Sequence, residues 1–146
     1  GELESKLTAV SARRDTAHAE IKRIESRSAE LALVMKHAGT YRQLKPLYDR
    51  YRKSNDKEKF LRGHESEIIL FEAAARELKR LGAVPLPTTE SMKTELANLN
   101  AEKERLLAEY KAARAEAQEY ETVKQNVDAL LTVPKEQEQQ RRHELE

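Results

Sequence analysis

The sequence predicts an all-α protein: a long antiparallel two-helix coiled-coil hairpin with a small helical subdomain inserted at its tip. Composition is the first observation behind this prediction, because 36% of the 146 residues are charged and only 5% are aromatic. Sheet proteins need frequent turns and many β-branched or aromatic residues, so this composition disfavours them. The second observation is a pair of long seven-residue apolar repeats, which favour a coiled coil over disorder, the other interpretation of a highly charged chain.

The first long helix is predicted over residues 1–38, where an apolar stripe advances in alternating steps of four and three residues. Only Arg14 and Ser28 interrupt the stripe with polar side chains. A repeat held over this length offers a continuous surface that a second helix can bury. The stripe consists of Leu3, Leu7, Val10, Arg14, Ala17, Ile21, Ile24, Ser28, Leu31, Met35 and Ala38.

The second long helix is predicted over residues 88–131, with the same repeat. Laid antiparallel on the first helix, it sets Tyr120 against Val10 and Leu99 against Leu31. A shift by one heptad keeps most layers apolar, so the register stays open. The second stripe consists of Met92, Leu96, Leu99, Lys103, Leu106, Tyr110, Ala113, Ala117, Tyr120, Lys124, Val127 and Leu131.

Residues 39–87 between the two repeats are predicted to form the small helical subdomain. Gly39 is a suitable residue to stop the first helix. Pro46 suits the first turn of a short helix over residues 46–53, since proline is tolerated there. After a break at 54–56, Asp56 is expected to cap a further turn that Gly63 ends.

A longer helix is predicted over residues 65–81, because Ile68, Phe71, Ala75 and Leu78 lie on one helical face. Gly82 is expected to end this helix. Thr88 follows a proline-rich stretch and is expected to be the N-cap of the second long helix. Residues 132–146 lack an apolar period and are predicted to be a polar, disordered tail.

Catalytic chemistry is not predicted. His18, His37, His64 and His143 lie far apart, and the chain has no cysteine, no glycine-rich phosphate loop and no nucleophile motif. We therefore expect a non-enzyme with no catalytic residues, no metal site and no cofactor. No apolar stretch approaches the roughly 18 residues of a membrane span, so no membrane partner is expected. The missing cysteines and signal-peptide pattern favour a cytoplasmic location.

Residues 41–62 carry an uneven charge, with eight basic and three acidic residues and hence a net charge of +5, whereas the remainder of the chain is net -4. Aromatic residues are interleaved with these bases. Single-stranded nucleic acids are bound by such a combination, since cations contact phosphates and rings stack on bases. The alternative interpretation makes the rings a small core and the bases its solvated face. The candidate residues are Arg42, Lys45, Arg50, Arg52, Lys53, Lys57, Lys59, Arg62, Tyr41, Tyr48 and Tyr51.

One set of ordered segments carries a resemblance to a known family: 39–41, 48–53, Phe60 with the helix 65–81, 86–88, 108–114 and 126–131. Through these segments, the region from about residue 30 to residue 131 resembles the C-terminal helical region of relaxases, the mobilisation nucleases of conjugative and mobilisable elements in Gram-positive gut bacteria.

The resemblance implies a role in DNA mobilisation. Relaxases nick a transfer origin with a tyrosine nucleophile and a histidine-held metal in an N-terminal domain. This chain has no histidine cluster, and its tyrosines lie in helical patterns, so no catalytic residue is carried over. The resemblance implies an accessory module that contacts DNA or docks to relaxosome and transfer proteins. The competing hypothesis from the residues alone is a structural coiled-coil module, which forms homo-oligomers or binds a protein without binding DNA.

Overall fold

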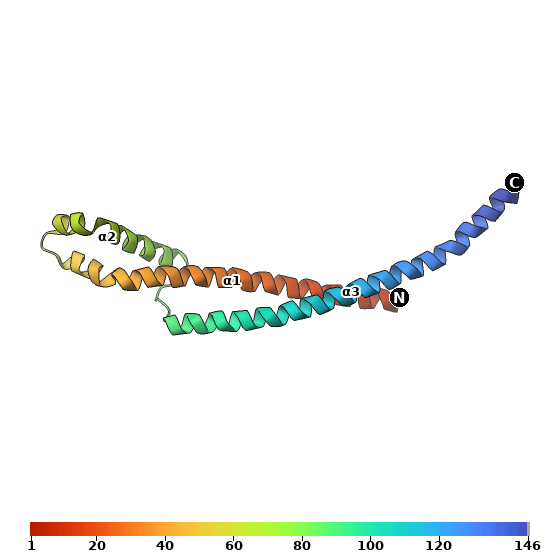
Figure 1. Ribbon diagram of the computed structural model, residues 1–146, viewed down its shortest axis with the longest axis horizontal. Helices are drawn as coiled ribbons and strands as arrows, with labels where there is room; N and C mark the ends of the chain where they lie inside the picture. Colours follow the sequence, from red (N-terminus) through yellow and green to blue (C-terminus); the bar gives the residue numbers. More distant parts are fainter. Residues whose placement is uncertain (146) are drawn as a thin grey trace. The chain divides into compact units, whose positions relative to one another are not determined.

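The computed structural model describes the backbone of residues 1–145 and the side chains of residues 1–132, and helices are its only regular secondary structure over that range. It contains α1 (Glu2–Lys53), α2 (Lys57–Arg80) and α3 (Thr89–Leu145), and no strand within that range (Figure 1). The predicted all-α fold class is therefore confirmed. No apolar stretch of bilayer-spanning length occurs in the helices of the described residues.

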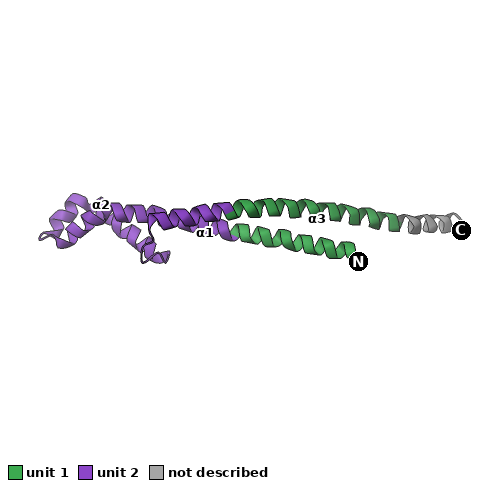
Figure 2. Ribbon diagram, turned by 90° about the horizontal axis from the view of Figure 1, so that it is seen from below, with its two compact units in different colours: residues 1–22, 102–146 green, residues 23–101 purple. Residues whose placement is uncertain are grey.

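The chain divides into two compact units, shown in different colours in Figure 2. Unit 1 combines residues 1–22 of the chain with residues 102–146, and unit 2 comprises residues 23–101. Within unit 1, the first turns of α1 lie antiparallel beside α3. Val10, Ala113 and Ala117 form a buried apolar cluster there, and Leu7 and Tyr120 pack against it. Small alanine side chains allow such close approach of two helices, as in coiled-coil packing.

Polar contacts flank this cluster in unit 1. Arg13 donates a hydrogen bond to Glu116 at 2.8 Å, and the rings of His18 and Tyr110 lie 5.8 Å apart. Val10 forms the buried cluster with Ala113 and Ala117, and Tyr120, its predicted partner, is only partly buried and packs against this cluster. Both apolar stripes therefore meet within this unit.

In unit 2, α2 folds back along the C-terminal part of α1, while α3 begins beside an earlier part of α1 (Figure 1). Apolar side chains from all three helices fill the core of this unit. The buried members are Ile24, Leu31, Val34, Ala38, Leu47, Ile68, Phe71, Ala74, Leu78, Ala83, Met92 and Leu99.

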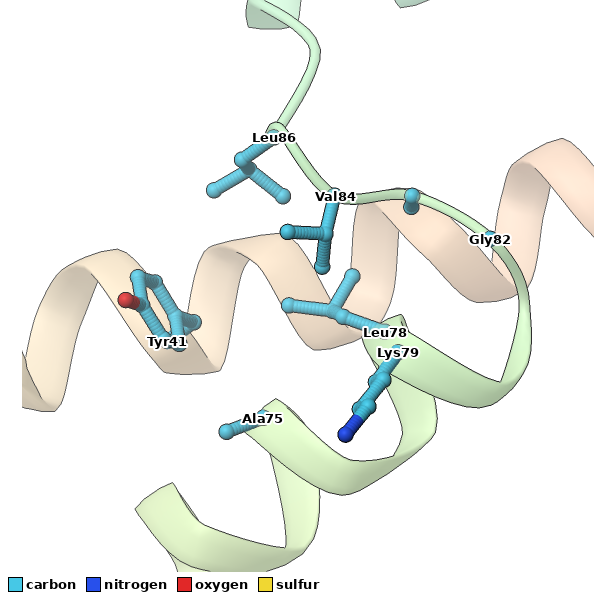
Figure 3. Close-up of a pocket in the computed structure, with 8 residues that line it drawn as sticks. Tyr41, Ala75, Leu78, Lys79, Gly82, Val84 and Leu86 are labelled. Atoms are coloured by element: carbon cyan, nitrogen blue, oxygen red, sulfur yellow. The ribbon is translucent and has the colours of Figure 1, made fainter.

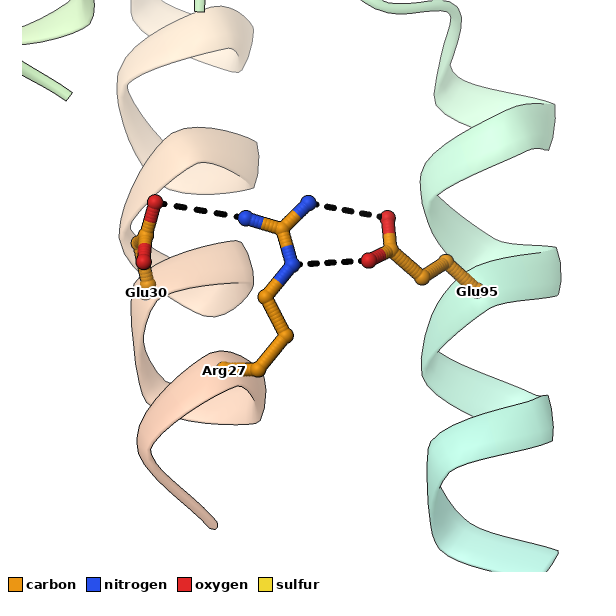
Figure 4. A network of polar contacts seen from close by, with 3 residues as sticks. All are labelled: Arg27, Glu30 and Glu95. Carbon is orange, nitrogen blue, oxygen red and sulfur yellow. Dashed lines mark hydrogen bonds and ion pairs between the residues drawn. The ribbon is translucent and has the colours of Figure 1, made fainter. Parts of the chain in front are cut away.

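One ion-pair network joins α1 to α3 in unit 2 (Figure 4). The guanidinium of Arg27 contacts Glu95 through two nitrogens, at 2.7 and 3.1 Å, and contacts Glu30 on its own helix at 3.2 Å. Hydrogen bonding to Arg27 lowers the pKa of Glu95 below its ordinary value, and the same contact raises the pKa of Arg27. This fork-like contact therefore links the two helices at this level.

The predicted helix stop at Gly39 is wrong, and so is the predicted helix start at Pro46. α1 continues through both residues to Lys53. A glycine inside a helix costs about 1 kcal/mol and a proline about 3 kcal/mol relative to alanine. Ala38 and Leu47 are buried beside them, at 0% and 9% exposure, so burial of apolar side chains opposes the local preference. The segment 39–53 is thus an extension of the first helix and not a separate one.

The predictions for α2 hold at its beginning. The Lys59 backbone N–H donates to the Asp56 carboxylate at 3.1 Å, so Asp56 is the N-cap. The predicted break at Gly63 is a kink inside a single helix, where His64 adopts φ -137° and ψ 25°. The two helices predicted on either side of Gly63 are therefore merged into one element.

The end of α2 and the beginning of α3 also match expectation. Gly82 follows the helix with φ +70°, the left-handed conformation that glycine adopts without strain. The Ser91 backbone N–H donates to the Thr88 hydroxyl at 3.1 Å, as in an N-cap. α3 then runs to Leu145, beyond the predicted end at Leu131. The side chains of residues 133–146 lie outside the described part, so the polar tail at 132–146 stays a prediction.

Candidate functional site

Six cationic side chains lie where α1 ends and α2 begins, and all six are exposed. The short connection at 54–56 joins the last turn of α1 to the first turns of α2, so these residues are close in the chain. None of the six forms an ion pair with another residue among those described. We call this set the basic surface: Arg50, Arg52, Lys53, Lys57, Lys59 and Arg62.

Helix electrostatics explain only part of this surface. The partial negative charge at a helix C-terminus favours cations, which accounts for Arg50, Arg52 and Lys53 in the last turn of α1. Lys57 and Lys59 lie in the first turn of α2, where the partial positive charge of the N–H groups repels them. Among the neighbouring residues, Asp56 and Glu58 supply the compensating negative charge. Helix stability therefore gives no reason for the two lysines.

Two of the predicted cationic candidates have partners within the fold. Arg42 donates hydrogen bonds to the Pro87 carbonyl and, at 3.0 Å, to the Thr89 hydroxyl, which ties α1 to the beginning of α3. Lys45 pairs with Asp49 one turn further along α1, at 3.1 Å. Because these two residues already have partners, we do not count them in the basic surface.

The predicted tyrosines take part in a continuous set of ring contacts between α1 and α2, which we call the aromatic ladder. The Phe71 ring stacks with Tyr41 and with Tyr48, at centroid distances of 4.8 and 4.3 Å. The ladder continues from Tyr48 to Tyr51 at 5.8 Å. Further contacts from Tyr51 to Phe60 at 6.0 Å and from Phe60 to His64 at 4.7 Å complete it.

This ladder supports the interpretation that the rings hold α1 against α2. Stacked and tilted aromatic pairs contribute about 0.5–1.5 kcal/mol each beyond the burial of their area. The three tyrosines nonetheless stay half-buried, whereas Phe71 is buried. Each tyrosine therefore combines a packing role with partial exposure, and Tyr41 and Tyr48 line surface hollows.

A shallow groove of about 420 Å³ lies beside the ladder and contains residues that the sequence prediction missed. Arg76 and Lys79 of α2 line it together with Arg52 of the basic surface. The predicted basic segment ended at residue 62, because charge was counted over consecutive residues. Arg76 and Lys79 are three residues apart, and Lys79 lies about two helical turns after Phe71, so this spacing was the signal that places them near the ladder.

The described residues contain no group of three or more His, Asp or Glu side chains placed to hold a metal ion. The donors around the basic surface are cationic, and cations of this kind bind anions such as phosphate. The arrangement can therefore bind a phosphate-bearing ligand.

Comparison with protein-family models, curated proteins and solved structures found no match. The resemblance to relaxases therefore stays a prediction.

Proposed function

We propose that this chain is a non-catalytic accessory module that contacts the phosphate backbone of single-stranded DNA through the basic surface. The observation that carries the proposal is the set of six exposed cations without ion-pair partners among the described residues. The repulsion between Lys57, Lys59 and the N-terminus of α2 supports it further, because a phosphate placed there would interact favourably with the lysines and with the helix.

We further propose that the module serves a DNA-mobilisation relaxase in the cytoplasm. There it helps hold the transferred DNA strand or docks to relaxosome proteins. This part of the proposal depends on the resemblance of residues 30–131 alone. The proposed architecture is the antiparallel coiled-coil hairpin of α1 and α3, with the end of α1 and α2 forming a tip subdomain. The contacts of α1 with α3 within each unit support that architecture.

The test measures binding of a fluorescent oligothymidylate by anisotropy at several salt concentrations. Neutralising six phosphates of a single strand predicts that log affinity falls with log salt with a slope of about -4. Replacing Arg50, Arg52 and Lys53 by Gln removes half of the cations, so the salt dependence should weaken to a slope of about -2. Circular dichroism checks that the variant keeps its helix content.

The matched control carries three Gln substitutions at exposed lysines away from the basic surface, Lys22, Lys93 and Lys111. It lowers the net charge of the chain by the same amount. Binding that weakens in the basic-surface variant and not in the control supports the proposal. Equal weakening in both variants would show a nonspecific charge effect, and no binding at low salt would exclude DNA contact.

A second candidate function is self-association, and exposed apolar side chains on α3 favour it. Val123, Val127, Leu130 and Leu131 are 46%, 42%, 72% and 68% exposed. Their spacing by three and four residues puts them on one face of the helix, which is typical of an unfilled coiled-coil seam. Light scattering over a range of concentrations tests this candidate: Val127→Glu with Leu131→Glu should convert an oligomer to a monomer, and a monomeric parent chain would exclude it.

A further inference from the structure

Two adjoining hollows lie on the face of unit 2 where α2 meets α1, and they share Tyr41, Ala75 and Lys79. The first hollow has a volume of about 460 Å³, and the second is the groove of about 420 Å³ beside the aromatic ladder. Small-molecule sites commonly have volumes of about 300–1,000 Å³. Together the hollows give an apolar compartment directly next to a cationic one.

The first hollow is mainly apolar (Figure 3). Leu78 of α2 and Val84 and Leu86 of the 81–88 connection line it, and the ring of Tyr41 forms one wall. Lys79 supplies the one charged side chain of the lining. Val84 is 66% exposed, so an apolar side chain is held at the open edge of the hollow. These walls suit a flat, weakly polar group that stacks on a tyrosine.

The second hollow has a different chemistry. Tyr48 and Phe71 of the ladder line its base, and Arg52, Arg76 and Lys79 lie around it. None of these three cations forms a direct ion pair with an acid among the described residues, although the charge of Arg76 also interacts with Glu77. Lys45 at the same groove is paired with Asp49. Glu72 also lines the groove, so the cations exceed the acids. This hollow suits an anion.

We propose that the two hollows seat one nucleotide unit of a single strand, with its base against Tyr41 in the apolar hollow and its phosphates at Arg52, Arg76 and Lys79. The inference rests on the proposed function, because Arg52 belongs both to this groove and to the basic surface. That continuity favours a nucleic-acid strand as the ligand, rather than an acidic peptide, because a strand can follow the cations and insert one base into the apolar hollow. Base stacking on an aromatic side chain is tolerant of base identity, so any exposed base would be accepted.

The test compares oligothymidylate with an oligonucleotide of the same length that has abasic sites throughout, since both carry the same phosphates. Oligothymidylate should bind about tenfold more tightly, because only it supplies a base. It should also quench tyrosine emission, which is observable directly because the chain has five tyrosines and no tryptophan. The abasic strand should leave that emission unchanged.

Val84→Glu puts a carboxylate at the edge of the apolar hollow, at an exposed position where folding tolerates it. This variant should reduce oligothymidylate binding to the level of the abasic strand. Arg76→Gln lies outside the basic surface and should weaken both strands about equally, by a few-fold. Circular dichroism confirms the fold of each variant.

The outcomes separate the two proposals. Equal affinity for the two strands, unaffected by Val84→Glu, would overturn the base site and leave the phosphate-binding function intact. No binding of either strand would overturn both. A third outcome has two parts: a leucine-bearing, glutamate-rich peptide binds the chain but not Val84→Glu, and the chain shows no preference for oligothymidylate over the abasic strand. This outcome would assign the groove to a peptide and overturn the nucleotide site.

Discussion

The contact between Arg27 and Glu95 gives a quantitative test of how α1 and α3 pack in unit 2. The perturbation is Glu95→Gln, which removes the negative charge and keeps the size of the side chain. It leaves a neutral amide oxygen opposite the guanidinium, so the charge-assisted part of the interaction is lost.

The expected magnitude follows from geometry and exposure. The contact is bidentate, at 2.7 and 3.1 Å, which favours the upper part of the range of about 0.2–1 kcal/mol for surface pairs. Both side chains are about 40% exposed, so water screens the pair and the pKa shifts cannot be converted directly into stability. We therefore expect Glu95→Gln to lower the free energy of unfolding by about 0.5–1 kcal/mol at pH 7.

The pH dependence has a definite sign. The pKa of Glu95 is lower in the folded chain than its unfolded value of about 4.3. Its stabilisation is therefore complete above that unfolded value and is lost as pH falls through the folded pKa. The difference between the parent chain and Glu95→Gln should be full at pH 7 and shrink progressively below about pH 5. Arg27 stays charged throughout this range, as arginine does at any pH well below its ordinary pKa.

Urea unfolding followed by circular dichroism, with a double-mutant cycle using Arg27→Gln, measures the coupling energy of the pair. Glu30→Gln is the matched control, because Glu30 contacts Arg27 at 3.2 Å within the same helix and does not join α1 to α3. It should cost only about 0.3 kcal/mol. A coupling energy near zero, or a Glu95→Gln effect that is the same at pH 7 and pH 3, would refute the interhelical contact.

Further predictions concern the core and the helix ends, and all are measured by urea unfolding with circular dichroism. Leu31→Ala removes a side chain that is only 2% exposed and should lower the free energy of unfolding by about 2–5 kcal/mol. Leu33→Ala, at 43% exposure, should change it by less than about 0.5 kcal/mol. Equal effects would contradict the assigned buried face of α1. Gly82→Ala should destabilise by roughly 1 kcal/mol because of its φ of +70°, but Gly39→Ala should stabilise by about 0.4–1 kcal/mol, since no atom within 4 Å opposes its Cβ. Thr88→Ala should cost about 1 kcal/mol through loss of the N-cap bond, and Thr88→Ser should restore most of it.

Local signals predicted much of this fold. Asp56 and Thr88 cap helices through hydrogen bonds that their side chains can form wherever a helix starts, and Gly82 supplies a conformation that other residues avoid. Such features depend on a few consecutive residues, so the sequence alone indicates them. The apolar repeats likewise predicted most of the buried side chains of α1 and α3, because periodicity determines a helix face. Val127 and Leu131, at the end of the second stripe, are exceptions, since they are 42% and 68% exposed.

The failures arose where packing between distant segments overrides a local preference. Gly39 and Pro46 are plausible helix boundaries in isolation, and only the burial of Ala38 and Leu47 in unit 2 explains why α1 continues. The groove was missed for a related reason: Arg52 and Arg76 are distant in sequence and meet only because α2 folds back on α1. Consecutive charge counting detects a basic segment but not a site made from two helical faces.

The proline inside α1 has a consequence for how the protein opens. Pro46 has no backbone N–H, so the carbonyl of Arg42 loses its usual helical donor at that point. The last turns of α1 are consequently less cooperative with the turns before the proline, while the aromatic ladder couples them to α2. We expect amide hydrogen exchange to reveal residues 47–80 as one foldon, which opens at lower free energy than the α1 segment before Arg42. The segment that carries the basic surface would then adjust to a ligand without disrupting the longer helix.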